Sequence, residues 1–472
     1  MDKELESQLA QCRPAVVPEC DPDFRPVILP YRLIAVQPGA PDSVPVRLAV
    51  ERENGFVSVF ETALFERAVS SGTAFRVMER ALKFFLWSRG GWRVFFQGPV
   101  SFFEMLRREY SRRGARAFDV AFMSDIYAKP FELLQAEAKD FPESRERRSR
   151  LGGHFDGCRV GFDLGASDYK VAAVVDGKPV YEEEIPWNPA EQQDPEYHYR
   201  EIQSGLRKAA SRLPRVDAIG GSAAGIYVNN EPRAASLFRS VPKDLFDSKV
   251  RTLFERIAAE WRVPFEVVND GEVTALAGRL SFGSGSVLGI AMGSSQAAGY
   301  INEEGFIPGW LDELAFAPLD LSPTATPDEW SGDAGVGAQY FSQQAVARLA
   351  AAAGLSFPDD MRLPERLKAV QELLEKGDEL ARRVFASIGV YLGYAIPWYE
   401  VFYSFRHLVV LGRVMSGRGG EVIMSEARAV LEREFPETAG RVELHLLDEK
   451  SRRVGQAVAA ASLPETDKEK HQ

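Results

Sequence analysis

Two stretches of the chain share one design, an apolar strand that runs into small residues and continues as a second strand. The first is RVGFDLGASDYKVAAVVDGKPVY, from Arg159 to Tyr181, and the second is VLGIAMGSSQAAGYINEEGFI, from Val287 to Ile307. Each pattern predicts a hairpin. Small side chains at such a turn let an anion approach backbone N–H groups. One such segment alone is best explained as an ordinary hairpin, but two in one chain can hold a polyphosphate from opposite sides.

The segments around the hairpins alternate between strand-like and helix-like patterns. The strands VDAIGGSAAG and PFEVVND each have a helical pattern nearby, and the chain is mostly helical after Gly332 before the strands HLVVLG and VELHLL. This alternation predicts an α/β fold built in two halves.

Shifts in composition divide the chain into expected parts. A charged segment with Pro and Gly is the best candidate for a linker, and the residues before it mix strand-like and helix-like runs. The expected parts are a loosely ordered N-terminus at 1–25, a small α/β domain at 26–135, the linker at 136–157, the first half at 158–285, the second half at 286–465 and a tail at 466–472.

The composition limits the classes of function. The 472 residues carry a net charge of −11, which argues against a nucleic-acid or membrane-surface protein. The basic run from Arg145 to Arg150 is interpreted as a solvated linker. We find no signal-peptide pattern and no apolar run long enough to span a bilayer. The three cysteines are too scattered for a disulfide framework or a thiolate metal site. We therefore expect a cytoplasmic protein.

Acidic residues at strand ends are the candidates for chemistry. Asp163 ends an apolar strand at the first hairpin turn, where a carboxylate can orient a metal-bound water beside phosphates. In VVNDGEVTALAG, Asp270 ends another strand and precedes a helix. It is either the N-cap of that helix or a general base at the strand edge where ligand sites of α/β proteins gather, and the two roles are compatible.

The order of these motifs resembles that of the ROK family of sugar kinases and related repressors, in the actin-like and hexokinase-like ATPase superfamily. The phosphate motif D-x-G-G-T-x-x-K of that family corresponds to Asp163–Lys170, the sugar-binding N-D pair to Asn269 and Asp270, and the second phosphate motif to Gly293–Gly299. The resemblance covers about Arg159 to Pro464. It implies two lobes of ribonuclease H-like fold with a central cleft, beside the additional N-terminal α/β domain.

The resemblance also implies a set of functional residues. Asp270 is the implied catalytic base, and Asp163 is implied to bind Mg²⁺ through water. The residues implied to bind ATP are Asp163, Gly165, Ser167, Lys170, Gly293, Ser294, Ser295, Gly412 and Arg413. The residues implied to contact the substrate are Asn269, Asp270, Glu313, Gly221 and Ser222. For Arg413, an ordinary surface position is about equally consistent with the sequence.

Two departures from the family pattern concern the sugar site and zinc. The family's E-x-G-H stands here as Glu313–Phe316, so the sugar-binding His is replaced by Phe316, which either stacks on a sugar or packs. The family's zinc loop corresponds to Glu329–Ala338 and has lost every cysteine and the final Glu. With no thiolates, and with five histidines far apart in sequence, we expect no zinc. Candidate replacements in the sugar site are Glu329, Asp333, Asp312 and the pair Asn229-Asn230.

Three functions of different class follow. The first is an ATP-dependent kinase acting on a carbohydrate-like small molecule. The second is a ligand-binding sensor on the same scaffold, and the third is an ATPase coupled to a partner through the N-terminal domain. DNA binding is not expected, because the N-terminal region shows no helix-turn-helix pattern with a basic face. A homodimer is consistent with the family. Retention of both Asp163 and Asp270 favours the kinase.

Overall fold

The computed structural model describes residues 3–146, 150–165, 167–283, 285–447 and 449–466. These residues form two compact units, which are described separately. The first unit comprises 1–146, 291–297 and 310–446, and the second comprises 147–290, 298–309 and 447–472. Ala166 of the first predicted turn, residues 147–149 of the basic run and residues 467–472 of the tail lie outside the described part.

The first unit contains a five-stranded sheet with the order β1-β3-β2-β4-β5. The neighbours are antiparallel except for β4 and β5, which are parallel. The elements of this region are α1 (Lys3–Gln11), α2 (Ile28–Ile34), β1 (Ala35–Val36), β2 (Ser43–Glu51), β3 (Val57–Phe65), α3 (Gly72–Arg89), β4 (Arg93–Gln97), α4 (Val100–Glu109), α5 (Ala117–Tyr127) and β5 (Glu132–Gln135). Helix α3 is N-capped by Ser71, whose side chain accepts a hydrogen bond from the Ala74 N–H, and it is buried along most of its length.

The second unit is built on a sheet with the order β12-β9-β6-β7-β8. Strands β6, β9 and β12 are parallel, and β7 and β8 continue the sheet antiparallel. Its elements are β6 (Cys158–Leu164), β7 (Asp168–Val175), β8 (Lys178–Pro186), α6 (Pro195–Ala210), β9 (Ala218–Ala223), β10 (Ile226–Val228), β11 (Glu231–Ala234), α7 (Lys243–Leu245), α8 (Leu253–Trp261), β12 (Phe265–Asn269), α9 (Asp270–Phe282) and α15 (Glu449–Ala461).

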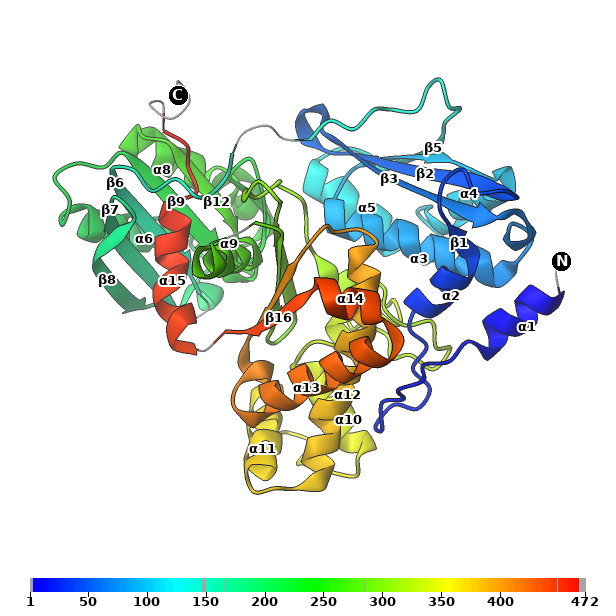
Figure 1. Ribbon diagram of the computed structural model, residues 1–472. Helices are drawn as coiled ribbons and strands as arrows, with labels where there is room; N and C mark the ends of the chain where they lie inside the picture. The colour runs from blue at the N-terminus through cyan, green and yellow to red at the C-terminus, as the bar shows by residue number, and fades with distance from the viewer. Residues whose placement is uncertain (1–2, 147–149, 166, 284, 448, 467–472) are drawn as a thin grey trace. The chain divides into compact units, whose positions relative to one another are not determined.

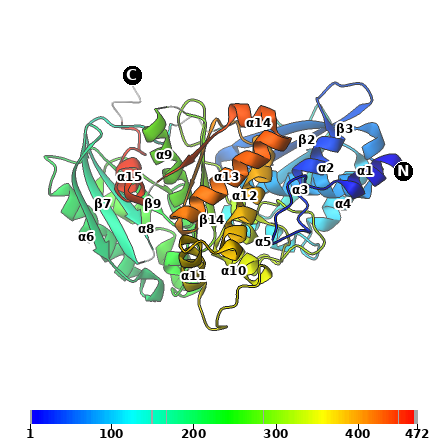
Figure 2. The same cartoon turned by 60° about the horizontal axis from the view of Figure 1, so that its bottom comes forward.

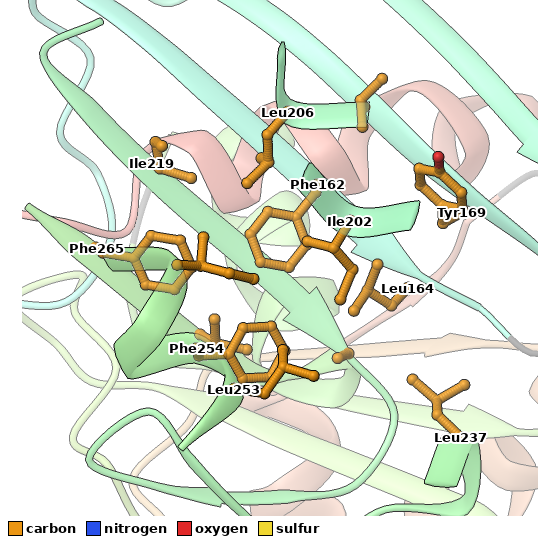
Figure 3. Close-up of a cluster of buried hydrophobic side chains, with 14 of the residues drawn as sticks. Phe162, Leu164, Tyr169, Ile202, Leu206, Ile219, Leu237, Leu253, Phe254 and Phe265 are labelled. Atoms are coloured by element: carbon orange, nitrogen blue, oxygen red, sulfur yellow. The ribbon is translucent and has the colours of Figure 1, made fainter. Parts of the chain in front are cut away.

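Alternation along β6 assigns the two faces of this sheet. Phe162 points into a large apolar cluster that includes Ile202 of α6 and Phe254 of α8 (Figure 3). The opposite face carries α15, which crosses the strands in Figure 1 and packs Ala457 against it. Because side chains of a strand alternate between faces, Asp163 at the end of β6 lies on the face opposite to Phe162.

The last sheet has the order β14-β13-β15-β16, with β15 and β16 parallel. The remaining elements are β13 (Val287–Met292), β14 (Gln296–Ile301), α10 (Gln343–Ala352), α11 (Leu363–Glu375), α12 (Glu379–Glu400), β15 (His407–Leu411), α13 (Arg418–Glu434), α14 (Pro436–Arg441) and β16 (Glu443–Leu446). Figure 2 shows α13 lying along α12, the long buried helix of the first unit.

The predicted α/β class is confirmed, including an α/β region before residue 136. Both predicted hairpins are present, and Asp176-Gly177 closes β7 and β8 with φ values of 48° and 75°, as a primed two-residue turn requires. The boundaries of the parts stay predictions. Among the described residues, no helix combines the length and the apolar character needed to cross a bilayer.

Candidate active site

Asp163 is held at the carboxyl end of β6 by the strands on either side. It pairs in register with Lys170 of β7 and with Ser222 of β9. The Lys170 Nζ lies 3.5 Å from Asp163 Oδ2 and 3.7 Å from an oxygen of Asp168. Burial raises the pKa of the Asp163 carboxyl, and the Lys170 charge opposes that shift. A carboxylate with one nearby cation therefore stands where the sequence predicted a metal-orienting acid.

The first hairpin turn is held together by its own backbone. The Gly165 N–H donates to the Asp168 carbonyl at 3.0 Å, and the Gly165 carbonyl accepts from Trp187 Nε1 at 2.8 Å. Ser167 is exposed, and its hydroxyl donates to Asp168 Oδ2 at 2.8 Å. The glycine N–H is thus engaged within the turn, contrary to the expectation that it lies open. A phosphate at this turn would have to be bound by the residues that follow Gly165.

Asp270 is the first residue of α9, and its neighbour Asn269 is the N-cap. The Asn269 side chain accepts from the Gly271 N–H at 2.7 Å, while Glu272 accepts from the Asn269 N–H at 3.1 Å. This reciprocal pair is a capping box. The interpretation of Asp270 as the N-cap is therefore wrong, and its carboxylate does not carry that role.

The electrostatic surroundings of Asp270 favour a base that works near neutral pH. Burial and the negative charge of Asp163 raise the pKa of Asp270 to about 6, while the backbone N–H groups of Asp270 and Gly271 oppose the shift. Asp163 and Asp270 are therefore electrostatically coupled. A general base is most effective when its pKa lies close to the working pH.

Asn269 is fixed by contacts at both ends of its amide. Besides the cap, its Nδ2 donates to the Gly225 carbonyl at 2.6 Å. We expect Asn269→Ala to lower the free energy of unfolding by about 1–2 kcal/mol, because the cap is lost. Urea unfolding measures this loss. Asn269→Ser keeps an accepting oxygen and should lose clearly less than Asn269→Ala, whereas equal losses would contradict the capping role.

The two predicted substrate residues of β9 lie on different faces. Ser222 is buried beside Asp163, and its hydroxyl lowers the pKa of that carboxyl, although no hydrogen bond of good geometry links it to another described residue. Gly221 faces the apolar core, where an added Cβ would lie 2.0 Å from the Phe162 ring. Packing thus accounts for the glycine at 221, and the structure brings Ser222, not Gly221, beside Asp163.

The second hairpin turn lies next to the end of β15, within the first unit. The Gly293 N–H donates to the Ser295 carbonyl and its carbonyl accepts from the Gln343 N–H, both at 2.9 Å. Gly412 directly follows β15 and has a φ of 108°. An added Cβ at this position would lie 2.4 Å from the carbonyl oxygen of Met292, the last residue of β13. The turn and the Gly412-Arg413 segment are therefore neighbours, and Ser294, Ser295 and Arg413 are exposed there.

Phe316 packs and does not present a face to solvent. Its ring centroid lies 4.5 Å from that of Trp87, and it also contacts Phe118, Phe122 and Trp330. Phe316 is buried. The residue in the position of the family's His is thus part of an aromatic cluster with helices α3 and α5.

Glu313 lies on the segment that runs beside the end of α3. Its N–H donates to the Trp87 carbonyl at 3.1 Å, and the N–H of Asp312 donates to Ser88 at 3.1 Å. Asp312 is buried and accepts from the Tyr403 hydroxyl at 2.6 Å. Asp312 is therefore a buried hydrogen-bond acceptor that links this segment to Tyr403.

The loop in the position of the family's zinc site is anchored by ion pairs. Asp333 accepts from Arg80 at 2.9 Å, from Lys83 at 2.9 Å and from Arg116 at 2.7 Å. Glu79 and Asp119 supply two further carboxylates, at 2.7 Å from Arg116 and 2.8 Å from Lys83. Asp333 is thus a structural residue of this cluster.

Of the remaining candidates for the sugar site, Asn229 and Asn230 are turn residues and Glu329 is a surface residue. Asn229 and Asn230 have φ values of 52° and 64° and form the turn between β10 and β11. The Asn230 side chain also accepts from the Val267 N–H at 2.6 Å and donates to the Phe265 carbonyl at 3.0 Å. Glu329 is exposed.

The comparisons with known proteins concern the fold. No protein-family model matches the sequence, and no curated protein matches it. A solved ROK-family transcriptional regulator, a homologue of the E. coli MLC protein, is similar with a TM-score of 0.50 and 17% identity, over 69% of this chain and 82% of the regulator.

Two solved kinases are similar over nearly their whole length. The ROK hexokinase from Thermus thermophilus has a TM-score of 0.49 and 17% identity, over 65% of this chain and 97% of the hexokinase. A ROK-family glucokinase from Streptomyces griseus, solved with glucose and AMPPNP, has a TM-score of 0.48 and 18% identity, over 64% of this chain and 98% of the glucokinase.

The regulator and this chain are similar in fold, with a TM-score of 0.50. The match leaves about a third of this chain uncovered, which agrees with an additional region beyond the shared fold. Over roughly two thirds of its length, the chain therefore shares the fold of this ROK-family regulator.

Proposed function

We propose that the chain is an ATP-dependent kinase that phosphorylates a hydroxyl group of a sugar or sugar derivative, with Asp270 as general base. The observation that most supports this proposal is the position and the raised pKa of the Asp270 carboxyl. Asp270 is the first residue of α9, and the N-cap of this helix is Asn269, not Asp270. The pKa of the Asp270 carboxyl is raised to about 6. Such a carboxylate can accept the hydroxyl proton as that oxygen attacks phosphorus.

The proposal includes Mg²⁺ held near Asp163. Oxygen ligands suit this ion, and the coupled carboxylates of Asp163 and Asp270 would be stabilised by a divalent cation. When bound, Mg²⁺ would offset the negative charge on the transferring phosphoryl group. Lys170 would help to neutralise phosphate on the same unit.

We propose ATP-binding residues for each unit by itself. On the second unit these are the exposed Ser167 and the half-buried Lys170, and on the first unit they are Ser294, Ser295 and Arg413 beside Gly412. Cations and small hydroxyl residues at hairpin turns are appropriate partners for phosphate oxygens. On the second unit, the sugar would be bound by Asn269 and Ser222.

A second candidate function is a non-catalytic sensor of a small ligand. Two observations favour it: Phe316 is packed in place of a sugar-binding His, and both ends of the Asn269 amide are engaged within the chain. Fewer hydroxyl partners would then remain for a sugar. A sensor would bind its ligand without consuming ATP.

A coupled assay of ADP release separates the two functions. ATP and Mg²⁺ are supplied with a panel of sugars, amino sugars and polyols, beside a reaction that has no acceptor. The kinase predicts ADP release that depends on one class of acceptor. ADP release equal to the acceptor-free rate across the whole panel would favour the sensor.

The pH dependence of the reaction follows from the pKa of Asp270. Only the ionised carboxylate can accept a proton, so kcat/KM should fall about tenfold for each pH unit below the pKa of Asp270, which is about 6 without a bound cation and is lowered by Mg²⁺. The profile is measured with the best acceptor and saturating ATP. A rate that stays constant from pH 7 to about pH 4.5 would exclude a base with this pKa.

A further inference from the structure

Two histidines that are distant in sequence meet with a glutamate at the edge of the last sheet. His407 is the first residue of β15, and Glu443 and His445 belong to β16. The parallel register places His407 beside Glu443 and Val409 beside His445. Since residues two apart on a strand share a face, Glu443 and His445 point to the same side. His407 is buried, His445 is half-buried and Glu443 is exposed.

The nitrogen and oxygen atoms of these side chains converge. His407 Nδ1 lies 3.1 Å from His445 Nε2 and 3.5 Å from Glu443 Oε2, and His445 Nε2 lies 3.8 Å from the same oxygen. A tetrahedral ion with bonds of about 2.0–2.1 Å holds neighbouring ligand atoms about 3.4 Å apart. The three observed separations bracket that value. The three atoms therefore already stand at distances suited to three corners of a metal tetrahedron.

We propose that His407, Glu443 and His445 bind a divalent transition-metal ion of the Zn²⁺ type, with the fourth position open to water. Two imidazoles and one carboxylate are a ligand set for zinc and its neighbours, whereas Mg²⁺ and Ca²⁺ prefer oxygen alone. His407 and His445 are far apart in sequence, 38 positions, and the pairing of their strands brings the two side chains together.

This site is separate from the proposed nucleotide site. His407 begins β15, and Gly412 follows the other end of the same five-residue strand. At about 3.3 Å per residue, the two ends are roughly 16 Å apart. Bound metal would link β15 to β16, the short strand at the edge of the sheet.

Two arginines surround the cluster and shape its chemistry. Arg406 donates to Glu443 Oε1 at 3.1 Å, which leaves Oε2 directed at the histidines. Arg428 donates to the Leu444 carbonyl at 3.2 Å, and its charge acts on His445. The Arg406 pair orients the carboxylate as outer-sphere partners of metal ligands do. The positive charges of the two arginines also lower the affinity of the cluster for a cation. The competing explanation for the short distance between the two imidazoles is a hydrogen bond between them, without a metal.

Metal binding to the chelator-treated full chain distinguishes these explanations. Co²⁺ serves as the spectroscopic probe, without nucleotide or acceptor, and Zn²⁺ is added as competitor. We expect one Co²⁺ per chain, with the intense visible absorption of four-coordinate cobalt, displaced by Zn²⁺. His445→Gln should abolish this absorption, and Glu443→Gln should weaken binding by about tenfold or more.

Matched variants complete the experiment. Glu437→Gln makes the same change at an exposed position six residues before Glu443, and His471→Gln removes another histidine; both should bind like the unaltered chain. Because Glu443 is exposed, Glu443→Gln remains informative if His445→Gln fails to fold. The proposal is overturned if no intense absorption develops, if it arises from cobalt–thiolate bands, or if Glu443→Gln and His445→Gln bind as tightly as the unaltered chain.

Discussion

Asp270→Asn lowers kcat of the proposed kinase by about a hundredfold or more, because the amide does not accept the proton of the attacking hydroxyl. The dissociation constant for ATP should change far less than kcat. The substitution preserves shape, and α9 keeps its N-cap because Asn269 supplies it. Loss of activity would therefore reflect chemistry and not unfolding of the helix. Steady-state kinetics with the best acceptor measures the loss.

Asp244→Asn is the matched control, since it makes the same chemical change at an exposed position of the same unit. It should leave kcat unaltered. If Asp270→Asn retained more than about a tenth of the original kcat, the removal of the proton would have to be assigned to another group.

Asp333→Asn is expected to lower the free energy of unfolding by about 3–5 kcal/mol. The substitution leaves Arg80, Lys83 and Arg116 with one carboxylate fewer in a largely buried cluster. Unpaired buried charges cost far more than exposed ones. Urea unfolding followed by tryptophan fluorescence measures the change, because Trp87 is fully buried in the same unit.

Asp359→Asn, an exposed position in the same unit, is the control and should change stability little.

Acid should reproduce the effect of Asp333→Asn. Burial alone would raise the pKa of Asp333, but the charges of Arg80 and Lys83 outweigh it and hold the pKa below its usual value. The contribution of Asp333 to the free energy of unfolding is thus complete above about pH 4, the pKa of an unfolded Asp. It is lost as the pH falls through the lower pKa that Asp333 has in the folded protein. A loss below about 1 kcal/mol for Asp333→Asn would show that the cluster contributes little.

Local patterns predicted most of the elements near the candidate site. The two strands predicted in the segment from Arg159 to Tyr181 are β6 and β7, which pair antiparallel. Strand β12 and helix α9 meet at Asn269 and Asp270, where the sequence placed them. Short-range signals of this kind suffice because hairpin turns and helix starts depend on a few neighbouring residues.

Features that depend on contacts between distant residues were not predicted. The choice of Asn269 over Asp270 as N-cap required the geometry of the backbone, although Glu272 three residues later was a signal for it. The packing of Phe316 on Trp87 and the ion pairs of Asp333 with Arg80 join segments far apart in the sequence. The meeting of His407 with His445 depends on which strands pair.

Direct detection of a phosphorylated acceptor tests the central claim most directly. The full chain is incubated with ATP, Mg²⁺ and the acceptor panel, and products are identified by mass spectrometry beside Asp270→Asn. We predict that one class of acceptor gains a single phosphate with the unaltered chain and almost none with Asp270→Asn. Nucleotide binding with no phosphorylated acceptor, or equal product from both proteins, would contradict the assignment of Asp270 as the base of a sugar kinase.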